Sequence, residues 1–331
     1  MNVRVTVIIP IYNAEKWLRE SLDSVCSQSL REIEIVCVND GSPDHSLEIL
    51  KEYAARDERI VIIDKKNEGV GAARNDGIRA AKGEFVAFMD PDDKYPDADT
   101  LSILYQAATE NHVLVAGGYL GCMNEAGESI PKSRSYFGVD FTCEGLVQYR
   151  DFQCDLQFSA YIYDRSFLIR RNLFFPTYVR FQDPPFFVNT MISAGSFYAV
   201  NQKTYIYRVG LEKPKFTDKK AFDFMCGLSD NLKRSKEEGL ARLHYLSAMR
   251  LLTDASYLVE ALADDEAFGG LLWQYIKTVG LIDEDLIAGA GYTLPEPVLP
   301  GLFGGLINES RQYRSLMKHK SVRALKKLLV R

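Results

Sequence analysis

The sequence lacks features that mark several common classes of protein. No apolar run is long enough to cross a bilayer, and the first residues lead into a short strand-like segment rather than a signal peptide, so we expect a cytoplasmic protein. The six cysteines are scattered without a C-x-x-C pair, and the four histidines show no metal-ligand spacing. Both patterns argue against disulfide bonds and a zinc site. We also expect no nucleic-acid partner.

Two familiar nucleotide-binding signatures are missing as well. The small residues at 69–73 precede Arg74 and Asn75, but they contain neither G-x-G-x-x-G after a strand nor G-K-S/T. We therefore interpret residues 69–81 as a tightly packed helix and not as a phosphate-binding loop.

What the chain does have is the composition of an ordinary globular protein. Its 331 residues, 47% hydrophobic and 26% charged, suffice for one large or two modest domains. Charge is uneven, because residues 311–331 contain eight lysines or arginines and no acid, whereas the net charge is −5. Apolar residues recur among these bases at helical spacing. The pattern predicts a basic amphipathic helix, which either lies on an anionic membrane surface or docks on the acidic body.

The first ninety residues alternate between strand-like and helix-like patterns. Apolar runs predict strands at 3–10, 33–38, 60–63 and 85–89, and helical spacing between them predicts helices after 13, at 46–55 and at 69–81. We expect Asn13 to cap the first helix. Repeated right-handed β-α units give a parallel sheet with helices on both faces, and ligands of such sheets bind at the carboxyl ends of the strands.

The later residues are less regular. Residues 101–111 predict a helix and 113–120 a strand, and from about 216 the composition becomes helical. Proline and glycine in 286–307 predict an apolar loop before the basic segment.

Three polar clusters fall at the carboxyl ends of the predicted strands. They are Tyr12–Asn13, Asp40–Ser42 and Asp90–Asp93. In the third cluster a buried strand runs directly into three carboxylates within four residues, and like charges held so close need a cation. A hard divalent ion, Mg²⁺ or Mn²⁺, suits one or two carboxylates there. Alternatively the cluster is a solvated turn, since Asp and Pro are ordinary turn residues.

At this point the sequence resembles family 2 glycosyltransferases, the inverting enzymes of bacterial polysaccharide synthesis. The segments that carry the resemblance occur in the family's order: V-I-I-P-I-Y-N (7–13), V-N-D-G-S-P-D (38–44), N-E-G-V-G-A-A-R-N-D-G-I (67–78), G-E-F-V-A-F-M-D-P-D-D (83–93), F-Q-D-P-P-F (181–186) and Y-I-Y-R-V (205–209). The resemblance implies a GT-A fold, an α/β class with a mostly parallel central sheet. We expect this domain at 1–212, with a nucleotide-sugar half (1–100) and an acceptor half (101–212), followed by a helical region at 213–331.

The resemblance also implies a donor site for a nucleoside-diphosphate sugar, most often a UDP-sugar. By that resemblance Asp40 accepts a hydrogen bond from the base, and Pro10 and Tyr12 form the wall against which the base lies. Lys65, or its neighbour Lys66, and Arg208 are expected near the diphosphate. The alternatives are a helix N-terminus for Asp40, a core position for Tyr12, a solvated charge pair for Lys65 and an acidic partner within the fold for Arg208.

The acidic cluster resembles the family's D-x-D signature. By that resemblance one carboxylate of the set contacts the ribose and another holds the divalent ion that bridges the diphosphate. We expect Asp92 to hold the ion, with Asp93 as the rival metal ligand, and Asp90 to be among the donor-binding residues. The ion offsets the charge that grows on the departing nucleoside diphosphate.

Asp183 resembles the family's catalytic base, which takes the proton of the acceptor hydroxyl. The residue before it is Gln182, where the family pattern has a second acid. We therefore predict an inverting transfer of a sugar to a hydroxyl of a saccharide or lipid-linked saccharide. The protein is expected in the cytoplasm, with peripheral attachment to the inner face of the cytoplasmic membrane as the alternative. The alternative is a degenerate, non-catalytic saccharide-binding or scaffold protein. A turn is the plainer interpretation of D-P-P.

Overall fold

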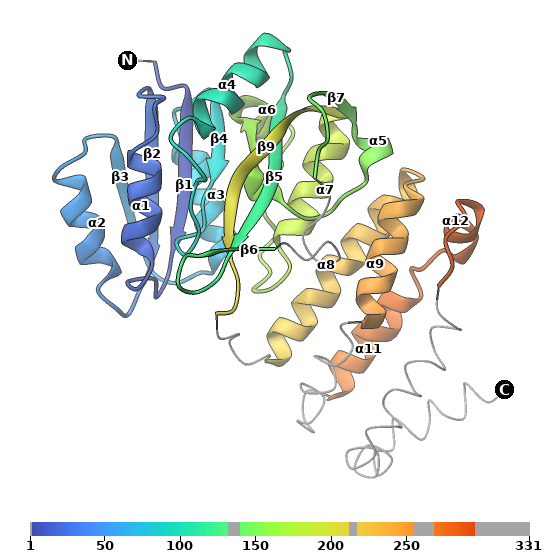
Figure 1. The fold of residues 1–331 in the computed structure, drawn as a ribbon. Coiled ribbons are helices and arrows are strands. Elements are labelled where there is room, and N and C mark those ends of the chain that lie inside the picture. Colours follow the sequence, from blue (N-terminus) through green and yellow to red (C-terminus); the bar gives the residue numbers. More distant parts are fainter. Residues whose placement is uncertain (1, 132–139, 212–216, 254–267, 295–331) are drawn as a thin grey trace. The chain divides into compact units, whose positions relative to one another are not determined.

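The computed structural model describes residues 2–131, 140–211, 217–253 and 268–294, and the chain divides into two units, Met1–Lys213 and Pro214–Arg331 (Figure 1). The first unit is built on a large sheet. Its first four strands are β1 (Val5–Ile11), β2 (Ile33–Asp40), β3 (Ile60–Lys65) and β4 (Phe85–Phe88), all parallel in the order β3-β2-β1-β4. Every residue of β1 and β2 is buried, as their branched apolar side chains predict.

Strand β1 lies between β2 and β4, so the direction of strand order reverses beside it. The chain moves outward from β1 to β3 and then crosses back to β4 on the other side of β1. In open α/β sheets such a reversal leaves a crevice at the carboxyl ends of the two strands. Tyr12 follows β1 and Asp90 follows β4 closely, so both lie at this position.

The second half of the sheet has mixed directions. Strand β8 (Tyr161–Asp164) is antiparallel to both β4 and β5 (Val115–Met123), whereas β9 (Ser196–Arg208) is parallel to β5. Strand β7 (Gly145–Gln148) closes the order, and β6 (Ser129–Ile130) pairs with β5. The predicted α/β class with a mostly parallel central sheet is confirmed, and its antiparallel strands belong to the half in which the sequence pattern was weakest.

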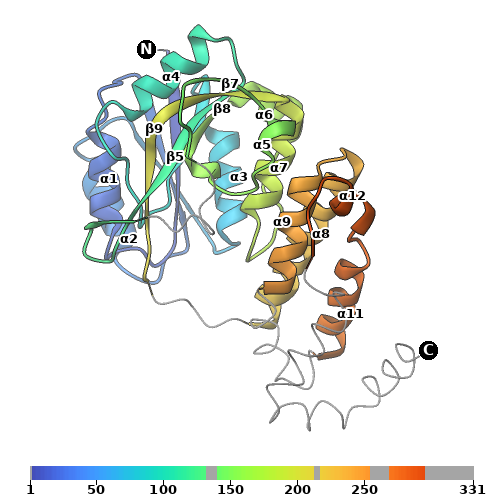
Figure 2. The same cartoon turned by 45° about the vertical axis from the view of Figure 1, so that its right-hand side comes forward.

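Helices cover both faces of the sheet. Figure 2 shows α1 (Leu18–Cys26) and α4 (Thr100–Glu110) on one side, and α3 (Val70–Ala80) and α7 (Asp183–Ala194) on the other. The remaining helices of this unit are α2 (Ser46–Ala54), α5 (Tyr149–Phe152), α6 (Arg165–Arg170) and the short 3₁₀ helix η1 (Phe158–Ala160).

One predicted helix start is wrong. Asn13 does not cap α1, because the helix begins at Leu18 with Trp17 as its N-cap residue and without a side-chain cap. Asn13 itself has a φ of 52°, a left-handed conformation that asparagine tolerates in turns. The turn lengthens the loop between β1 and α1.

Helix α3 packs very closely on the sheet, as its small residues predict. A Cβ atom on Gly77 would lie 2.3 Å from Cγ2 of Ile8 in β1, so only glycine fits there. Ala73 packs in the same layer against Val36 and Val38 of β2. The close packing fixes the N-terminus of α3 near the carboxyl ends of the strands.

The second unit is helical, as predicted. Its described helices are α8 (Asp218–Glu237), α9 (Ala241–Thr253), α11 (Phe268–Val279) and α12 (Glu284–Gly289), with Leu232, Ala248 and Ile287 in the core. Helix α12 corrects the expected loop at 286–307, because Asp283 caps a helix there by accepting a hydrogen bond from the Leu286 N–H. The rest of that segment and the basic segment 311–331 lie outside the described residues. No helix in the described parts of the chain is long and apolar enough to span a membrane.

Candidate active site

The acidic loop after β4 is held in place by the end of β9. The Tyr205 hydroxyl accepts a hydrogen bond from the Asp90 N–H (2.9 Å) and donates one to Oδ2 of Asp93 (2.7 Å). The backbone N–H of Arg208 donates to the other oxygen, Oδ1 of Asp93 (2.7 Å). The segment Y-I-Y-R (205–208) therefore holds the acidic loop in place through hydrogen bonds to Asp90 and Asp93.

The adjacent acids Asp92 and Asp93 differ in their surroundings. Asp93 is 1% exposed and both of its oxygens are hydrogen-bonded; burial and the neighbouring Asp92 raise the pKa of Asp93 well above its usual value. Burial and the neighbouring Asp90 raise the pKa of Asp92 to about 6. Among the described residues no side chain pairs with the Asp92 carboxylate. Asp92 is thus the acid of this loop whose charge is left for an external cation.

This donor set fits one divalent ion of the Mg²⁺ or Mn²⁺ kind. Such ions keep several waters and are commonly held by one or two carboxylates together with substrate phosphates. Asp92 would supply the carboxylate, whereas Asp93 is already occupied by Tyr205 and Arg208. Within the described ranges no group of three or more His, Cys, Asp or Glu side chains forms a metal cage. An ion here would therefore depend on ligands from a bound phosphate.

A buried arginine that sequence reasoning treated as packing lies beside the acidic loop. Nη2 of Arg74 donates to Oδ1 of Asp90 (2.6 Å), and its guanidinium lies over the rings of Phe158 and Phe175 at 4.7 and 5.2 Å. Arg74 is 3% exposed, yet its Nε and Nη1 atoms have no hydrogen-bond partner in the described structure. Buried N–H groups of a cation are normally satisfied, so these two fit an anionic ligand.

Asp183 lies at the same rim, as the first residue of α7. Burial raises the pKa of Asp183 even though the charges of Arg74 and Arg180 lower it, and the nearby Asp90 raises it further. Those interactions place its carboxylate within electrostatic reach of both Arg74 and Asp90. The preceding residue, Gln182, is buried and packs against the start of α3. Its Cγ atom lies 3.5 Å from the point that a Cβ atom on Gly71 would occupy.

The two residues expected to lie against the nucleotide base, Pro10 and Tyr12, differ in exposure. Pro10 is buried within β1, whereas Tyr12 is 53% exposed just past the end of the strand. The register pairs Ile11 with Asn39, which places Tyr12 and Asp40 at the same level of the sheet edge. The exposed Tyr12 ring is available for stacking.

Asp40 has a structural role that the sequence did not predict. It is 2% exposed, and its two oxygens accept hydrogen bonds from the N–H groups of Glu68 (2.9 Å) and Gly69 (2.8 Å). Gly69 has a φ of 95° and is the N-cap residue of α3. Asp40 thus fixes the turn that leads into α3.

The two cations expected near a diphosphate have acidic partners within the fold. Lys65 pairs with Glu68 and Asp76, and Arg208 pairs with Glu20. The structure therefore brings Asp90, Asp92 and Asp183 together with Arg74. Lys65 and Arg208 are paired with acidic side chains, although Arg208 lies against the acidic loop. Sequence spacing gives no signal for the pairs Lys65–Asp76 and Arg208–Glu20, although the arginine in A-A-R-N could have been tested as a ligand.

Known proteins share both the sequence pattern and the fold. A family model described as glycosyl transferase family 2 matches residues 6–175, about half of the chain. The uncharacterized glycosyltransferase EpsJ of Bacillus subtilis (strain 168) is 34% identical over 210 residues, which cover 62% of this chain and 60% of that protein. The matched stretches span less than two thirds of the length of the first curated relatives.

Solved structures with the same fold include two that contain nucleotide sugars. S. aureus TarS 1–349 in complex with UDP-GlcNAc aligns with a TM-score of 0.66 at 19% identity, over 86% of this chain and 82% of that one. The mannosyltransferase PcManGT from Pyrobaculum calidifontis, in complex with GDP-Man and Mn²⁺, aligns with a TM-score of 0.54 at 18% identity, over 98% and 87% of the two chains.

Proposed function

Because the chain belongs to glycosyl transferase family 2, we propose that it transfers a sugar from a nucleoside-diphosphate sugar, with a UDP-sugar as the first candidate. The acceptor is a hydroxyl of a saccharide or lipid-linked saccharide. One observation carries the proposal: the Asp92 carboxylate, which has no hydrogen-bond or ion-pair partner among the described residues, lies with Arg74 and Asp183 beside the reversal of strand order.

The donor would bind with its base toward β1 and its diphosphate toward β4. Tyr12 offers an exposed ring for the base. Asp40 would reach the base only through lone pairs that its two backbone hydrogen bonds leave over. Two buried nitrogens of Arg74 would donate to the diphosphate, and Asp90 holds that guanidinium in place.

A divalent ion, Mn²⁺ or Mg²⁺, would be held by Asp92. When bound, it supplies positive charge that stabilises the departing nucleoside diphosphate. The proposal assigns the ion to Asp92 rather than Asp93, because each Asp93 oxygen already accepts a hydrogen bond, from Tyr205 or Arg208, whereas the Asp92 carboxylate has no such partner among the described residues. The part of Asp93 is to hold the loop that presents Asp92.

Asp183 would take the proton of the acceptor hydroxyl as that oxygen displaces the nucleotide. Its raised pKa makes it a stronger base than an exposed aspartate. A single displacement of this kind inverts the anomeric configuration.

A thermal-shift and calorimetric screen tests the binding half of the proposal. The chain is titrated with UDP, GDP and their sugars, each with and without Mn²⁺, because a ligand that binds only the folded state raises the melting temperature. We expect stabilisation by one nucleoside diphosphate that increases when Mn²⁺ is present. No stabilisation by any of them would contradict the proposal.

A second candidate function rests on Gln182. The family pattern has an acid there, so a degenerate member that binds saccharide without catalysis fits the same fold. Release of free sugar from the donor with Mn²⁺ present separates the two, because a non-catalytic protein would bind the donor without consuming it.

We also propose that residues 311–331 attach the protein to the cytoplasmic face of an anionic membrane. Removing the residues after Ser310 is expected to reduce association with anionic liposomes while leaving nucleotide binding intact. Unchanged association would favour docking of the segment on the protein.

A further inference from the structure

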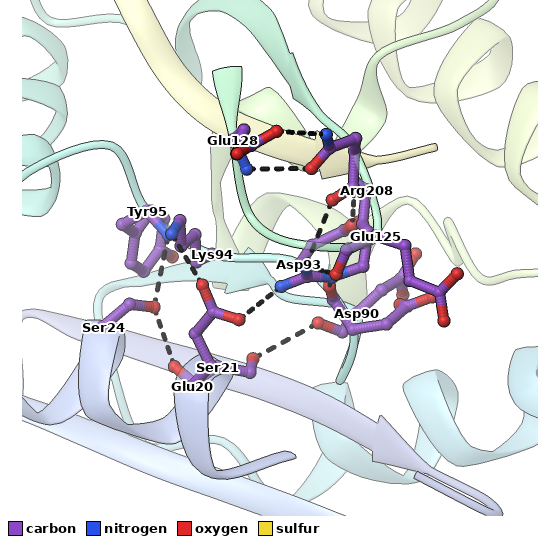
Figure 3. Close-up of polar contacts among 12 residues, drawn as sticks. Glu20, Ser21, Ser24, Asp90, Asp93, Lys94, Tyr95, Glu125, Glu128 and Arg208 are labelled. Atoms are coloured by element: carbon purple, nitrogen blue, oxygen red, sulfur yellow. Dashed lines mark hydrogen bonds and ion pairs between the residues drawn. The ribbon is translucent and has the colours of Figure 1, made fainter. Parts of the chain in front are cut away.

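We infer that Glu20, on α1, is a positioning residue for Asp92, because it holds the arginine that fixes the backbone of the acidic loop (Figure 3). The inference rests on the proposed function, since it assigns a role in presenting the metal-binding carboxylate. In this inference Arg208 does not make the diphosphate contact that the family resemblance implies, but supports the acidic loop from inside the protein.

Each nitrogen of the Arg208 guanidinium has an acceptor within the protein. Nε donates to the backbone oxygen of Asp92 (2.8 Å), and Nη1 donates to the backbone oxygens of Asn124 (3.3 Å) and Glu125 (3.0 Å). Nη2 pairs with Oε2 of Glu20. The side chain is 1% exposed, so an approaching phosphate would have to break these bonds.

The same arginine is covered by an aromatic ring of the loop before α1. Its guanidinium carbon lies 4.2 Å from the centre of the Trp17 ring. A buried guanidinium in contact with an aromatic face is favourable when an anion compensates its charge. Glu20 is the carboxylate that pairs with Arg208 in the described structure.

Glu20 also holds the other side of the loop. Its Oε1 accepts a hydrogen bond from Nζ of Lys94 (2.6 Å), and Lys94 exchanges two backbone hydrogen bonds with Ile206 of β9, at 3.2 and 2.9 Å. Figure 3 shows Glu20 between Lys94 and Arg208. One carboxylate thus joins the residue that follows Asp93 to the arginine bonded to Asp92.

The network has a consequence for the charge on Asp92. Nε of Arg208 donates to the backbone oxygen of Asp92, and the carboxylate of Asp92 forms no hydrogen bond or ion pair with a cation among the described residues. Without the negative charge of Glu20, Arg208 would be an uncompensated buried cation, and the Asp92 carboxylate is a nearby anion. An ion pair formed there would compete directly with a metal ion. Glu20 therefore keeps Arg208 on the backbone of the loop.

The test is Glu20→Gln, which removes the charge and keeps the size. Glu52→Gln is a matched control, because Glu52, like Glu20, pairs with two cations, here Arg19 at 2.6 Å and Arg56 at 2.8 Å, and its side chain is 35% exposed against 38% for Glu20. Mn²⁺ binding is measured by electron paramagnetic resonance with saturating UDP or GDP, whichever wild type binds, and nucleotide affinity is measured separately without metal.

We expect Glu20→Gln to weaken Mn²⁺ binding about 10-fold or more, the usual effect of losing an outer partner of a metal ligand. Metal-free nucleotide affinity should change less than about twofold, well below the 10-fold loss expected for Mn²⁺. Glu52→Gln should match wild type in both measurements. Normal Mn²⁺ affinity in Glu20→Gln overturns the inference, and so does an equal loss of metal-free nucleotide affinity, which would indicate general damage.

Two further outcomes are distinguishable. If Glu20→Gln does not fold, Glu20→Asp keeps the charge but shortens its reach; weaker Mn²⁺ binding at an unchanged melting temperature supports the positioning role, and wild-type affinity overturns it. If wild type binds no Mn²⁺ with either nucleotide, the proposed function fails and the inference fails with it.

Discussion

Two neighbouring regions at the carboxyl ends of buried parallel strands contain aspartates, Asp40 at the end of β2 and Asp92 and Asp93 after β4, but the carboxylates have different partners. Asp40 after β2 gives both oxygens to backbone N–H groups at the start of α3. After β4, Asp93 is bonded by β9, whereas Asp92 has no side-chain partner among the described residues. The position of an acid at a strand end is therefore not enough to assign its role, because its hydrogen-bond partners decide whether it orders the protein or is available to a ligand.

The substitution Asp92→Asn tests that distinction with the largest expected effect. It removes the charge available to the metal, so we expect Mn²⁺-dependent nucleotide binding to weaken by more than the about 10- to 100-fold cost of losing an outer partner. Calorimetry with and without Mn²⁺ measures it. Asp99→Asn is the control, because Asp99 is exposed and its side chain caps nothing. Unchanged binding in Asp92→Asn would reject Asp92 as the metal contact.

The substitution Asp183→Asn sharpens the comparison between acids that bind and an acid that reacts. Loss of a general base typically reduces turnover by about 10²- to 10⁴-fold, and donor affinity with Mn²⁺ should remain. Donor consumption and calorimetry on the same preparation separate the two. If donor affinity falls together with turnover, Asp183 belongs to the donor site instead.

The substitution Asp40→Asn should act on the fold more than on the metal. The amide keeps one acceptor and directs an N–H₂ group at a backbone N–H that it formerly satisfied, which costs about 1–3 kcal/mol of unfolding free energy. Urea unfolding measures this cost. Mn²⁺ affinity should stay near that of wild type, and a large loss of Mn²⁺ affinity without loss of stability would remove the contrast between the two loops.

The pH dependence gives the smallest effect. Burial and Asp90 raise the pKa of Asp92 to about 6, so protons compete with the metal below that pH. We expect Mn²⁺ affinity to be constant at pH 7–8 and to fall toward about tenfold per unit below pH 6. The fall should be absent from the residual binding of Asp92→Asn. An identical pH profile in that variant would assign the titration to another group.

Local patterns predicted the parts of the site that local structure determines. Branched apolar runs specify β1 to β4, and the polar residues after them must then meet at one edge of the sheet. The small residues of α3 predicted close packing, which Gly77 against Ile8 bears out. Asn13 failed as a cap because the polar residue stands several positions before the helix, and its left-handed turn serves the loop.

Contacts between distant residues could not be predicted from the sequence. Glu20 and Arg208 are 188 positions apart, and Tyr205 meets Asp93 across 112 positions. Neither pair has a spacing that a periodic pattern would reveal. The two unsatisfied nitrogens of Arg74 are likewise a property of packed aromatic rings around the side chain. These contacts between distant residues determine which acids and cations already have a partner within the protein and which are available to a ligand.

Anomalous diffraction at the manganese edge, from crystals grown with Mn²⁺ and the nucleoside diphosphate that stabilises the protein, is the most direct test. We expect a peak within about 2.0–2.3 Å of an Asp92 carboxylate oxygen and none in contact with Asp93 or Asp40. A peak bound by Asp93 or Asp40, or a nucleotide bound with no manganese beside Asp92, would contradict the account.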